Sequence, residues 1–303
     1  MKLNLSKHDR ICFLGDSITA AGLWVKEVAQ WFLDNLPELE IGLYNCGISG
    51  KRGSEKNTKN VFVSDCVRYF PKYVVIMYGM NDVDVISHEN ENKENLENIK
   101  YAIDGYPDTL NYYIDECRKI GATPIICSPT PYDEYSDVEA KNYKGTDRDL
   151  AIFADKAEKI AKENGLIYVN MRKALFEHLD KNPVREDRVH PNSYGHHLMA
   201  EEFLYTIGAK EIREIDKECV VSPENEKRYE TEQILRNVMF VERLWQDEEG
   251  TKSIEEQKKY AKEYCEKQED KRWLEWGKGF IENVDYKDEL RGAIVKLTLD
   301  MYK

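Results

Sequence analysis

The chain has 303 residues, of which 41% are hydrophobic and 33% charged, with a formal net charge of -13. This hydrophobic content suffices for a substantial buried core, whereas the negative charge excludes a general nucleic-acid binder, which needs a basic face to displace phosphate counterions. No apolar run approaches the roughly 20 residues that cross a bilayer, and the N-terminus lacks a secretory leader pattern. We therefore expect a cytoplasmic protein with no membrane partner and no nucleic-acid partner.

Short apolar runs alternate with helical patterns over the first two thirds of the chain. The predicted strands are 10–14, 41–45, 73–78, 123–128 and 166–170, and the predicted helices lie near 21–35, 54–69, 95–120, 147–164 and 193–208. Gly121 and Gly165 are suitable C-terminal stops for two of these helices. Such alternation is typical of parallel βαβ units, so we predict an α/β fold with a parallel sheet.

The Gly15-Asp16-Ser17 tripeptide follows the first predicted strand and precedes an amphipathic stretch from Leu23 to Leu36. A serine on such a strand-to-helix turn lies at the carboxyl edge of the sheet, where open α/β folds bind their ligands. The helix N-terminus behind it favours developing negative charge. Ser17 is therefore our candidate nucleophile.

A carboxylate lies three residues before a histidine in Asp187-Arg188-Val189-His190. A serine hydroxyl needs an imidazole to take its proton, and the imidazole needs a carboxylate that fixes its tautomer and stabilises its charge. Asp187 and His190 fit these roles and complete a candidate triad with Ser17. Activity is then predicted to rise with pH, because only the neutral imidazole acts as a base.

An oxyanion that forms on the substrate needs preorganised hydrogen-bond donors. Gly50 follows the second predicted strand, and Asn81 follows the third. The predicted oxyanion hole consists of the backbone N–H groups of Ser17 and Gly50 and the side-chain amide of Asn81.

The ordered residues Ser17, Gly50, Asn81 and His190 occur in Gly-Asp-Ser, Ser-Gly, Gly-x-Asn-Asp and Asp-x-x-His blocks. In this respect the chain resembles the SGNH/GDSL hydrolase family, that is, the GDSL-like lipases and acylhydrolases, over residues 8–209. The resemblance implies a three-layer α/β/α, flavodoxin-like fold and the same triad and oxyanion-hole roles. Because the family includes esterases, carbohydrate deacetylases, thioesterases and lysophospholipases, it defines the reaction better than the substrate.

Aromatic and polar side chains near the predicted strand ends favour a sugar ester as substrate, because aromatic rings bind the apolar faces of pyranoses. We select Trp24, Tyr78 and Tyr132 as substrate contacts, together with Asp16, which also suits a hydrogen-bonding turn role. The predicted function is a serine esterase that removes small acyl groups, especially acetyl, from small-molecule or oligosaccharide esters through an acyl-serine. Two alternatives stay open. One is a short-chain thioesterase, general carboxylesterase or lysophospholipase-like acylhydrolase, and the other is a non-catalytic carbohydrate-binding or scaffold protein.

Residues 210–303 differ from the rest of the chain in being rich in charge and lacking a convincing strand. Apolar residues recur at helical spacing in three series, at 234, 238, 241 and 245, at 273, 276, 280 and 284, and at 290, 294, 297 and 301. This pattern predicts three amphipathic helices. We expect a catalytic domain over 1–209 and an all-helical extension over 210–303. The extension is a structural appendage, covers part of the active-site mouth or forms a homo-oligomer.

Seven cysteines are scattered at positions 12, 46, 66, 117, 127, 219 and 265 without a Cys-x-x-Cys pair, and the chain has no His-Glu-x-x-His motif. The set indicates reduced thiols and gives little support to a zinc site. Because acyl transfer through a serine needs no metal, we predict neither a metal nor a cofactor.

Overall fold

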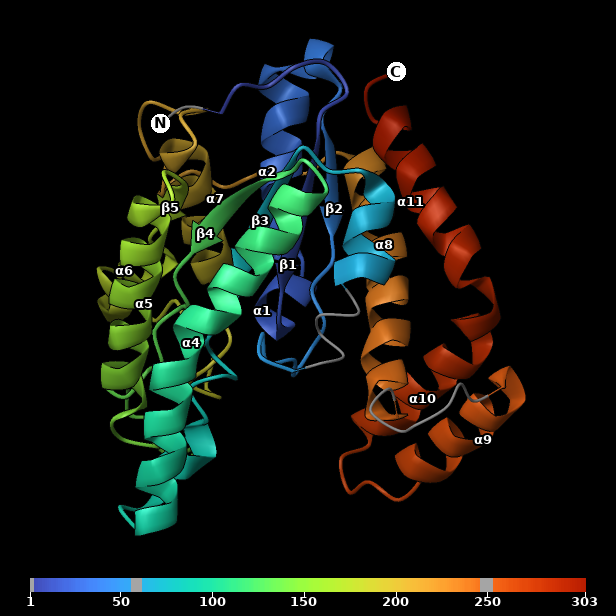
Figure 1. The fold of residues 1–303 in the computed structure, drawn as a ribbon. Coiled ribbons are helices and arrows are strands. Elements are labelled where there is room, and N and C mark those ends of the chain that lie inside the picture. The colour runs from blue at the N-terminus through green and yellow to red at the C-terminus, as the bar shows by residue number, and fades with distance from the viewer. Residues whose placement is uncertain (1–2, 56–61, 246–252) are drawn as a thin grey trace. The chain divides into compact units, whose positions relative to one another are not determined.

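The computed structural model describes residues 3–55, 62–245 and 253–303 and divides into two compact units, residues 1–221 and 222–303 (Figure 1). The boundary that we placed at 209/210 from the sequence therefore comes too early in the chain. Residues after 209 are tied to helix α7 (Ser193–Thr206). The Lys210 ammonium pairs with the Glu201 carboxylate of α7, and the backbone N–H of Glu214 donates to the same carboxylate at 2.7 Å.

The first unit is built on a five-stranded parallel sheet with the strand order β2-β1-β3-β4-β5. Each strand agrees with the predicted range to within one residue at either end. The strands are β1 (Arg10–Gly15), β2 (Gly42–Asn45), β3 (Tyr73–Met77), β4 (Thr123–Cys127) and β5 (Ile167–Val169). Every residue of the central strand β3 is buried, which explains why an uninterrupted apolar run predicted it.

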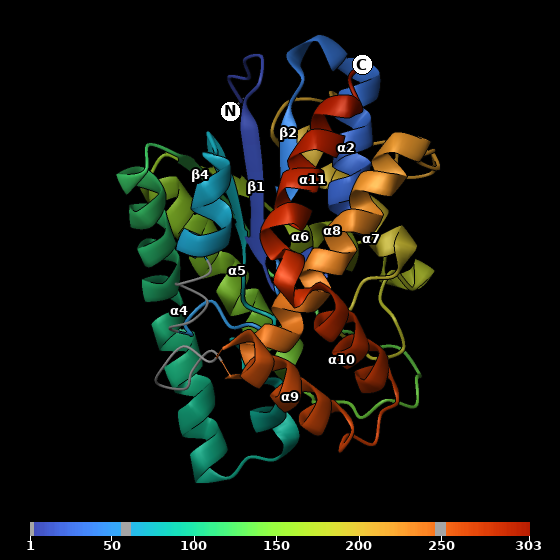
Figure 2. The same ribbon diagram turned by 90° about the vertical axis from the view of Figure 1, so that its right-hand side faces the viewer.

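Helices cover both faces of this sheet. Helix α4 packs against α5, and α2 packs against α7. Figure 2 shows α4 on one side of the strands and α2 and α7 on the other, so the predicted three-layer α/β/α fold is confirmed. The α-helices of the unit are α1 (Ser17–Ala20), α2 (Leu23–Asn35), α4 (Lys93–Lys119), α5 (Thr146–Glu163), α6 (Met171–Phe176) and α7. Short turns of 3-10 helix are η1 (Pro37–Leu39), η3 (Val67–Tyr69), η4 (Val85–Glu89) and η5 (Leu179–Lys181), and η2 (Phe62–Cys66) is a π-helical turn.

The predicted helix over 54–69 is the main error in this unit. Residues 54–55 form a turn, residues 56–61 lie outside the described ranges, and residues 62–69 form η2 and η3 and not an α-helix. The Asp82 carboxylate accepts hydrogen bonds from the backbone N–H groups of Gly53 and Ser54 at 3.0 and 3.1 Å. These long-range bonds hold the chain in a turn where local periodicity favoured a helix.

The second unit is helical and has an apolar core of its own. It consists of α8 (Pro223–Glu242), η6 (Arg243–Trp245), α9 (Ile254–Cys265), α10 (Arg272–Asn283), η7 (Val284–Tyr286) and α11 (Lys287–Asp300). The core cluster contains Val238, Val241, Ala261, Phe280 and Val284. The three predicted apolar series belong to α8 with η6, to α10 with η7, and to α11 with its C-cap residue Met301, although the side chain of residue 245 lies outside the described part of the chain.

Helix α9 is a fourth helix that the sequence analysis missed. It buries only the small side chains of Ala261 and Cys265, so it lacks the bulky apolar stripe that marks the other three. Its N-terminal signal is clear in retrospect, because Ser253 and Glu256 form a reciprocal capping box. Within residues 3–55, 62–245 and 253–303, no helix combines the length and the apolar character needed to cross a membrane.

Candidate active site

Ser17 lies at the turn between β1 and α1, where tight packing requires glycine at the preceding strand end. A Cβ atom at Gly15 would lie 2.3 Å from Thr19 Oγ1 and 2.7 Å from the carbonyl oxygen of Met77. The Asp16 carboxylate caps α1 by accepting a hydrogen bond from the backbone N–H of Ile18 at 3.0 Å. The Gly-Asp-Ser sequence thus fixes the turn sterically and by capping, and it leaves Ser17 partly exposed at the carboxyl edge of the sheet.

Ser17, His190 and Asp187 form a continuous hydrogen-bonded chain. The distance from Ser17 Oγ to His190 Nε2 is 2.7 Å, and that from His190 Nδ1 to Asp187 Oδ2 is 2.8 Å. With the proton on Nδ1, the imidazole donates to the carboxylate and Nε2 accepts from the serine hydroxyl. The imidazole is thereby oriented to take the Ser17 proton, which is the geometry of a serine nucleophile with its base.

The surroundings of Asp187 keep its carboxylate ionised. Partial burial disfavours the charge, but the His190 ring and the backbone N–H groups of His190 and Val189 all donate to it, at 2.8, 2.9 and 3.0 Å. These hydrogen bonds outweigh desolvation and lower the pKa of Asp187 well below its ordinary value. A charged carboxylate is therefore present to stabilise an imidazolium at His190 throughout the neutral range.

The three candidate oxyanion donors follow three adjacent strands. Ser17 follows β1, Gly50 follows β2 and Asn81 follows β3, and β1 lies between the other two in the sheet. Gly50 has a φ of +72°, which favours glycine there. The Asn81 side-chain amide donates to the carbonyl oxygen of Lys51 at 3.0 Å, which orients the amide and leaves it a second N–H. All three groups thus lie at the edge of the sheet that carries Ser17.

The buried Asp82 carboxylate holds the backbone next to this edge by accepting hydrogen bonds. Besides the two backbone bonds described above, it accepts from Ser54 Oγ at 3.1 Å, which gives this residue a structural role. A cavity of about 450 Å³ lies beside it and is lined by residues that include Arg52, Ser54, Asp84 and Tyr101. Arg52 and Asp84 form an ion pair at 2.9 Å across this region. Sequence reasoning did not single out these residues, because each contact joins segments that are distant in the chain.

Three of the four predicted substrate contacts are core residues. Trp24 is completely buried against Phe13 and Phe203, with ring centroids 5.0 and 5.8 Å away. Tyr78 and Tyr132 are 2% and 1% exposed. Tyr78 stacks on Tyr113 with ring centroids 5.5 Å apart. The structure therefore contradicts Trp24, Tyr78 and Tyr132 as substrate contacts, because closeness to Ser17 or to a strand end in sequence does not determine the direction of a side chain.

Asp16, the fourth predicted contact, is also buried, at 2% exposure. Burial raises the pKa of this carboxyl to about 7, although the hydrogen bond from Ile18 and the nearby His190 both act in the opposite direction. Its structural role is to cap α1, which agrees with the turn role that we considered. A buried histidine, His196, also lies near the triad. Burial lowers its pKa to about 3, so it stays neutral.

Arg188 is the residue that the sequence analysis passed over. It lies between Asp187 and His190 in the chain and is 4% exposed. A basic residue in a short polar loop normally indicates a solvated side chain, and the sequence carries no sign that this one is buried.

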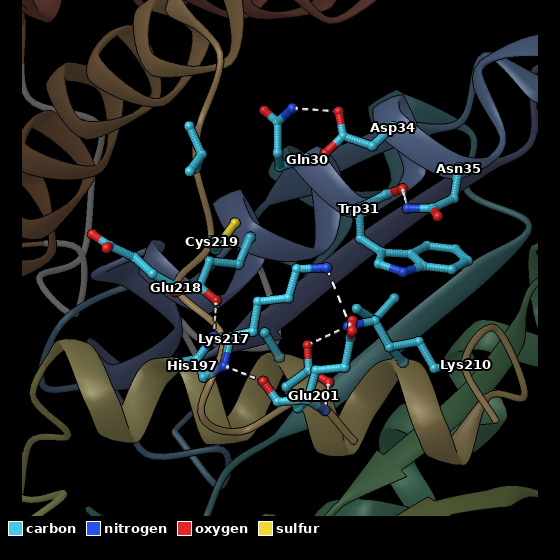
Figure 3. Close-up of a pocket in the computed structure, with 15 residues that line it drawn as sticks. Gln30, Trp31, Asp34, Asn35, His197, Glu201, Lys210, Lys217, Glu218 and Cys219 are labelled. Carbon is cyan, nitrogen blue, oxygen red and sulfur yellow. Dashed lines mark hydrogen bonds and ion pairs between the residues drawn. The ribbon is translucent and has the colours of Figure 1, made fainter. Parts of the chain in front are cut away.

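A polar pocket lies between α2 and α7, away from this site (Figure 3). Its lining includes Trp31, His197 and Lys210, whereas Ser17, Asp187 and His190 are not among the described residues that line it. His197 Nδ1 lies 2.7 Å from a Glu27 carboxylate oxygen, and its Nε2 lies 3.1 Å from the carbonyl oxygen of Glu214. These contacts fasten residues after 209 onto α2 and α7. His197 therefore has a structural role.

Three cysteines come together in the core of the first unit. The Sγ atoms of Cys12, Cys46 and Cys66 lie within 4.8 Å of one another. Burial raises the pKa of both Cys12 and Cys66 well above the ordinary value of a thiol. Without a bound metal, this burial keeps the thiols protonated.

A parallel α/β sheet with a serine, a histidine and a carboxylate linked at its carboxyl edge defines the class of serine-dependent hydrolases. The model of the GDSL-like Lipase/Acylhydrolase family matches residues 13–198, and the chain therefore belongs to this family and is an acylhydrolase. An acetylxylan esterase of Geobacillus stearothermophilus is 25% identical over 229 residues, which cover 70% of this chain and 99% of that protein. An uncharacterized lipoprotein of Bacillus subtilis is 26% identical over 133 residues, or 42% of this chain and 51% of that protein.

Two solved structures share this fold. The crystal structure of the acetylxylan esterase from G. stearothermophilus matches with a TM-score of 0.57 at 25% identity, over 70% of this chain and all of that one. A gut microbial diltiazem-metabolizing enzyme matches with a TM-score of 0.75 at 16% identity, over 100% of this chain and 96% of that chain. This second likeness shows the fold alone, and it extends to the helical unit.

Proposed function

We propose that this protein is a serine esterase that hydrolyses acetyl esters of carbohydrates through an acyl-serine intermediate. The hydrogen-bonded chain from Ser17 through His190 to Asp187 carries the proposed mechanism. The likeness to an acetylxylan esterase supports the proposed substrate class. The aromatic side chains that first favoured sugars no longer support it, because three of the selected residues are buried.

In the proposed first step, Ser17 Oγ attacks the ester carbonyl carbon while His190 Nε2 takes the hydroxyl proton. The negative charge on the carbonyl oxygen is held by the backbone N–H groups of Ser17 and Gly50 and by the Asn81 amide. Asp187 stabilises the imidazolium, which then protonates the departing sugar oxygen as its bond to the acyl carbon breaks. Water repeats the same sequence on the acyl-serine and releases acetate, which returns Ser17 and His190 to their starting states.

The proposal is tested by measuring acetate release from acetylated mono- and oligosaccharides, with p-nitrophenyl acetate and acetyl thioesters as comparison substrates. The parent and Ser17→Ala are assayed side by side. We expect sugar-ester turnover by the parent and a loss of about 10⁴-fold or more in Ser17→Ala, because the nucleophile is removed. Turnover confined to simple esters or thioesters would support the general carboxylesterase or thioesterase instead. Unchanged sugar binding without any turnover would support the non-catalytic alternative.

The role of the helical unit stays a prediction, as does the cytoplasmic location. A covering of the active-site mouth and a homo-oligomer through the C-terminal helices are both open. Deleting residues 222–303 addresses the two together, with light scattering for mass and the same acetate assay for turnover. A shortened chain that is soluble, matches the parent in oligomeric state and is fully active would contradict both predictions.

A further inference from the structure

Arg188 is a buried cation whose described hydrogen-bond acceptors are all backbone carbonyls. Its guanidinium donates to the carbonyl oxygens of Asp133 at 2.9 Å, Ser136 at 3.0 Å, Val138 at 2.8 Å and Ala140 at 2.9 Å. A guanidinium loses much of its hydration on burial, and removing its partners would leave an uncompensated charge. A side chain that is 4% exposed and fully engaged with one loop is therefore part of a built contact.

A separate hydrogen bond connects the same two segments, with the 133–140 segment as the donor. The backbone N–H of Asp133 donates to the carbonyl oxygen of Arg188 at 2.9 Å. Arg188 has a φ of +68°, a conformation that costs a non-glycine residue about 1 kcal/mol or more and persists only where the surroundings enforce it. Main chain and side chain of this one residue thus fasten the 133–140 segment to the loop that carries Asp187 and His190.

Hydrogen bonds from neighbouring residues fix the first part of the 133–140 segment. The Asp133 carboxylate accepts from the backbone N–H groups of Tyr135 and Ser136 at 3.1 and 3.0 Å. The Asp147 carboxylate at the start of α5 accepts from the backbone N–H of Tyr132 and pairs with Arg172. These bonds fix residues 132–136, which carry two of the four carbonyls that receive Arg188, and they reach back to α5 and α6.

The loop around the triad is a narrow turn with Arg188 near its tip. Val184 bridges to Pro191, the backbone N–H of Arg185 donates to the carbonyl oxygen of His190 at 2.8 Å, and that of Arg188 donates to the carbonyl of Arg185 at 2.9 Å. Asp187 and His190 are therefore attached to one short turn. A shift of that turn moves both away from Ser17.

We infer that Arg188 is a positioning residue, whose guanidinium fork clamps the triad turn to the 133–140 segment and so holds the imidazole of His190 on Ser17. This inference rests on the esterase function proposed above. It assigns Arg188 no contact with the substrate, so its loss lowers kcat for small and large esters by similar factors and leaves KM nearly unchanged. An error of about 1 Å in such a site costs about 100-fold in rate.

The test compares Arg188→Ala, Arg188→Lys and a matched control, Arg185→Ala, which removes an exposed arginine from the same turn. Arg188→Lys keeps the charge but cannot reproduce the four-carbonyl fork, because an ammonium is a point donor. We expect both Arg188 variants to lose about 30- to 100-fold in kcat on p-nitrophenyl acetate, and Arg185→Ala to stay within about twofold. Millimolar guanidinium, at a concentration that does not unfold the parent, restores turnover to Arg188→Ala and not to Arg188→Lys.

Hydrogen exchange supplies a readout that does not need turnover. Backbone amides of 133–140 and 183–192 exchange faster in Arg188→Ala than in Arg185→Ala, while the strands keep the protection of the parent. Full activity in Arg188→Lys would overturn the inference, since charge alone would then suffice, as would unchanged exchange in Arg188→Ala. If Arg188→Ala does not fold, Arg188→Lys carries both readouts. A parent without turnover on any ester would refute the proposed esterase, and the exchange comparison would still test the clamp.

Discussion

The two units of this chain both bury charged side chains, and the candidate triad belongs to the first. In residues 1–221, charged and polar groups such as Asp16, Asp82 and Arg188 lie buried at the edge of the sheet that carries Ser17. Residues 222–303 enclose a hydrocarbon cluster and also a buried ion pair, in which Arg228 and Glu232 lie 3.1 Å apart. Pairs such as Lys259 with Glu263 and Lys278 with Glu282 lie exposed on helix surfaces. Buried polar groups cost desolvation unless every partner is in place, whereas a hydrocarbon cluster needs only volume. Substitutions around the candidate triad should therefore alter rates and pH dependence, and those in the hydrocarbon cluster of the second unit should alter stability.

The sharpest contrast is expected from Asp187→Asn. The amide keeps the size of the carboxylate but stabilises the wrong tautomer of His190 and cannot stabilise an imidazolium, so kcat should fall by about 10⁴-fold. Turnover of p-nitrophenyl acetate and thermal unfolding are measured together, and the exposed neighbour variant Glu186→Gln serves as the control. A loss of less than tenfold would mean that another group orients His190.

In the second unit, Phe280→Ala should act on stability alone. Phe280 is completely buried in the helical cluster, and removing such a side chain costs about 3–5 kcal/mol. Hydrogen exchange of the backbone amides of α8, α10 and α11 measures the loss in the second unit, because tryptophan fluorescence would also report Trp24 and Trp31 of the first unit. Leu274→Ala on the same helix is the control, because Leu274 is 49% exposed and its truncation should change stability by less than about 0.5 kcal/mol. A marked fall in turnover while the unit stays folded would show that the helical unit takes part in the reaction.

Asp16→Asn should give a smaller effect that depends on pH. Because burial raises the pKa of Asp16 to about 7, the folded state holds this proton more tightly than the unfolded chain does. Stability is then lost as pH rises from about 4 to about 7 and stays constant above that value. The amide keeps the cap on α1 without ionising, so the variant should gain about 2 to 4 kcal/mol over the parent at pH 8 relative to pH 4. Unfolding titrations at both pH values measure this, and the exposed Asp104→Asn should show no such change.

Local sequence was sufficient for the sheet and for the motifs at its edge. The strands were predictable because each is an apolar run between turn residues, and burial on both faces makes such runs uninterrupted. Ser17, Gly50 and Asn81 each occur in a short motif after a strand, and Asp187 and His190 share one motif, so the sequence alone is enough to select them. Their catalytic roles stay predictions that the variants above test.

What the sequence could not predict depends on contacts between distant segments. The turn at Gly53 and Ser54 is held by Asp82, and the burial of Arg188 depends on carbonyls about fifty residues earlier in the chain. Helix α9 escaped detection because its buried side chains are small. Trp24 looked like a substrate contact only because it follows the nucleophile closely, whereas the helical phase directs it into the core against Phe13.

The close packing at Gly15 has a consequence for how far this sequence can vary. Even the single methyl group of alanine would collide with Thr19 Oγ1 and with the carbonyl of Met77 on the neighbouring strand. A second substitution at position 19 can remove the Thr19 hydroxyl, but every residue at position 77 has the same backbone carbonyl. In a saturation library at position 15, glycine should therefore be the only survivor, and a compensating change at Thr19 should rescue none of the others.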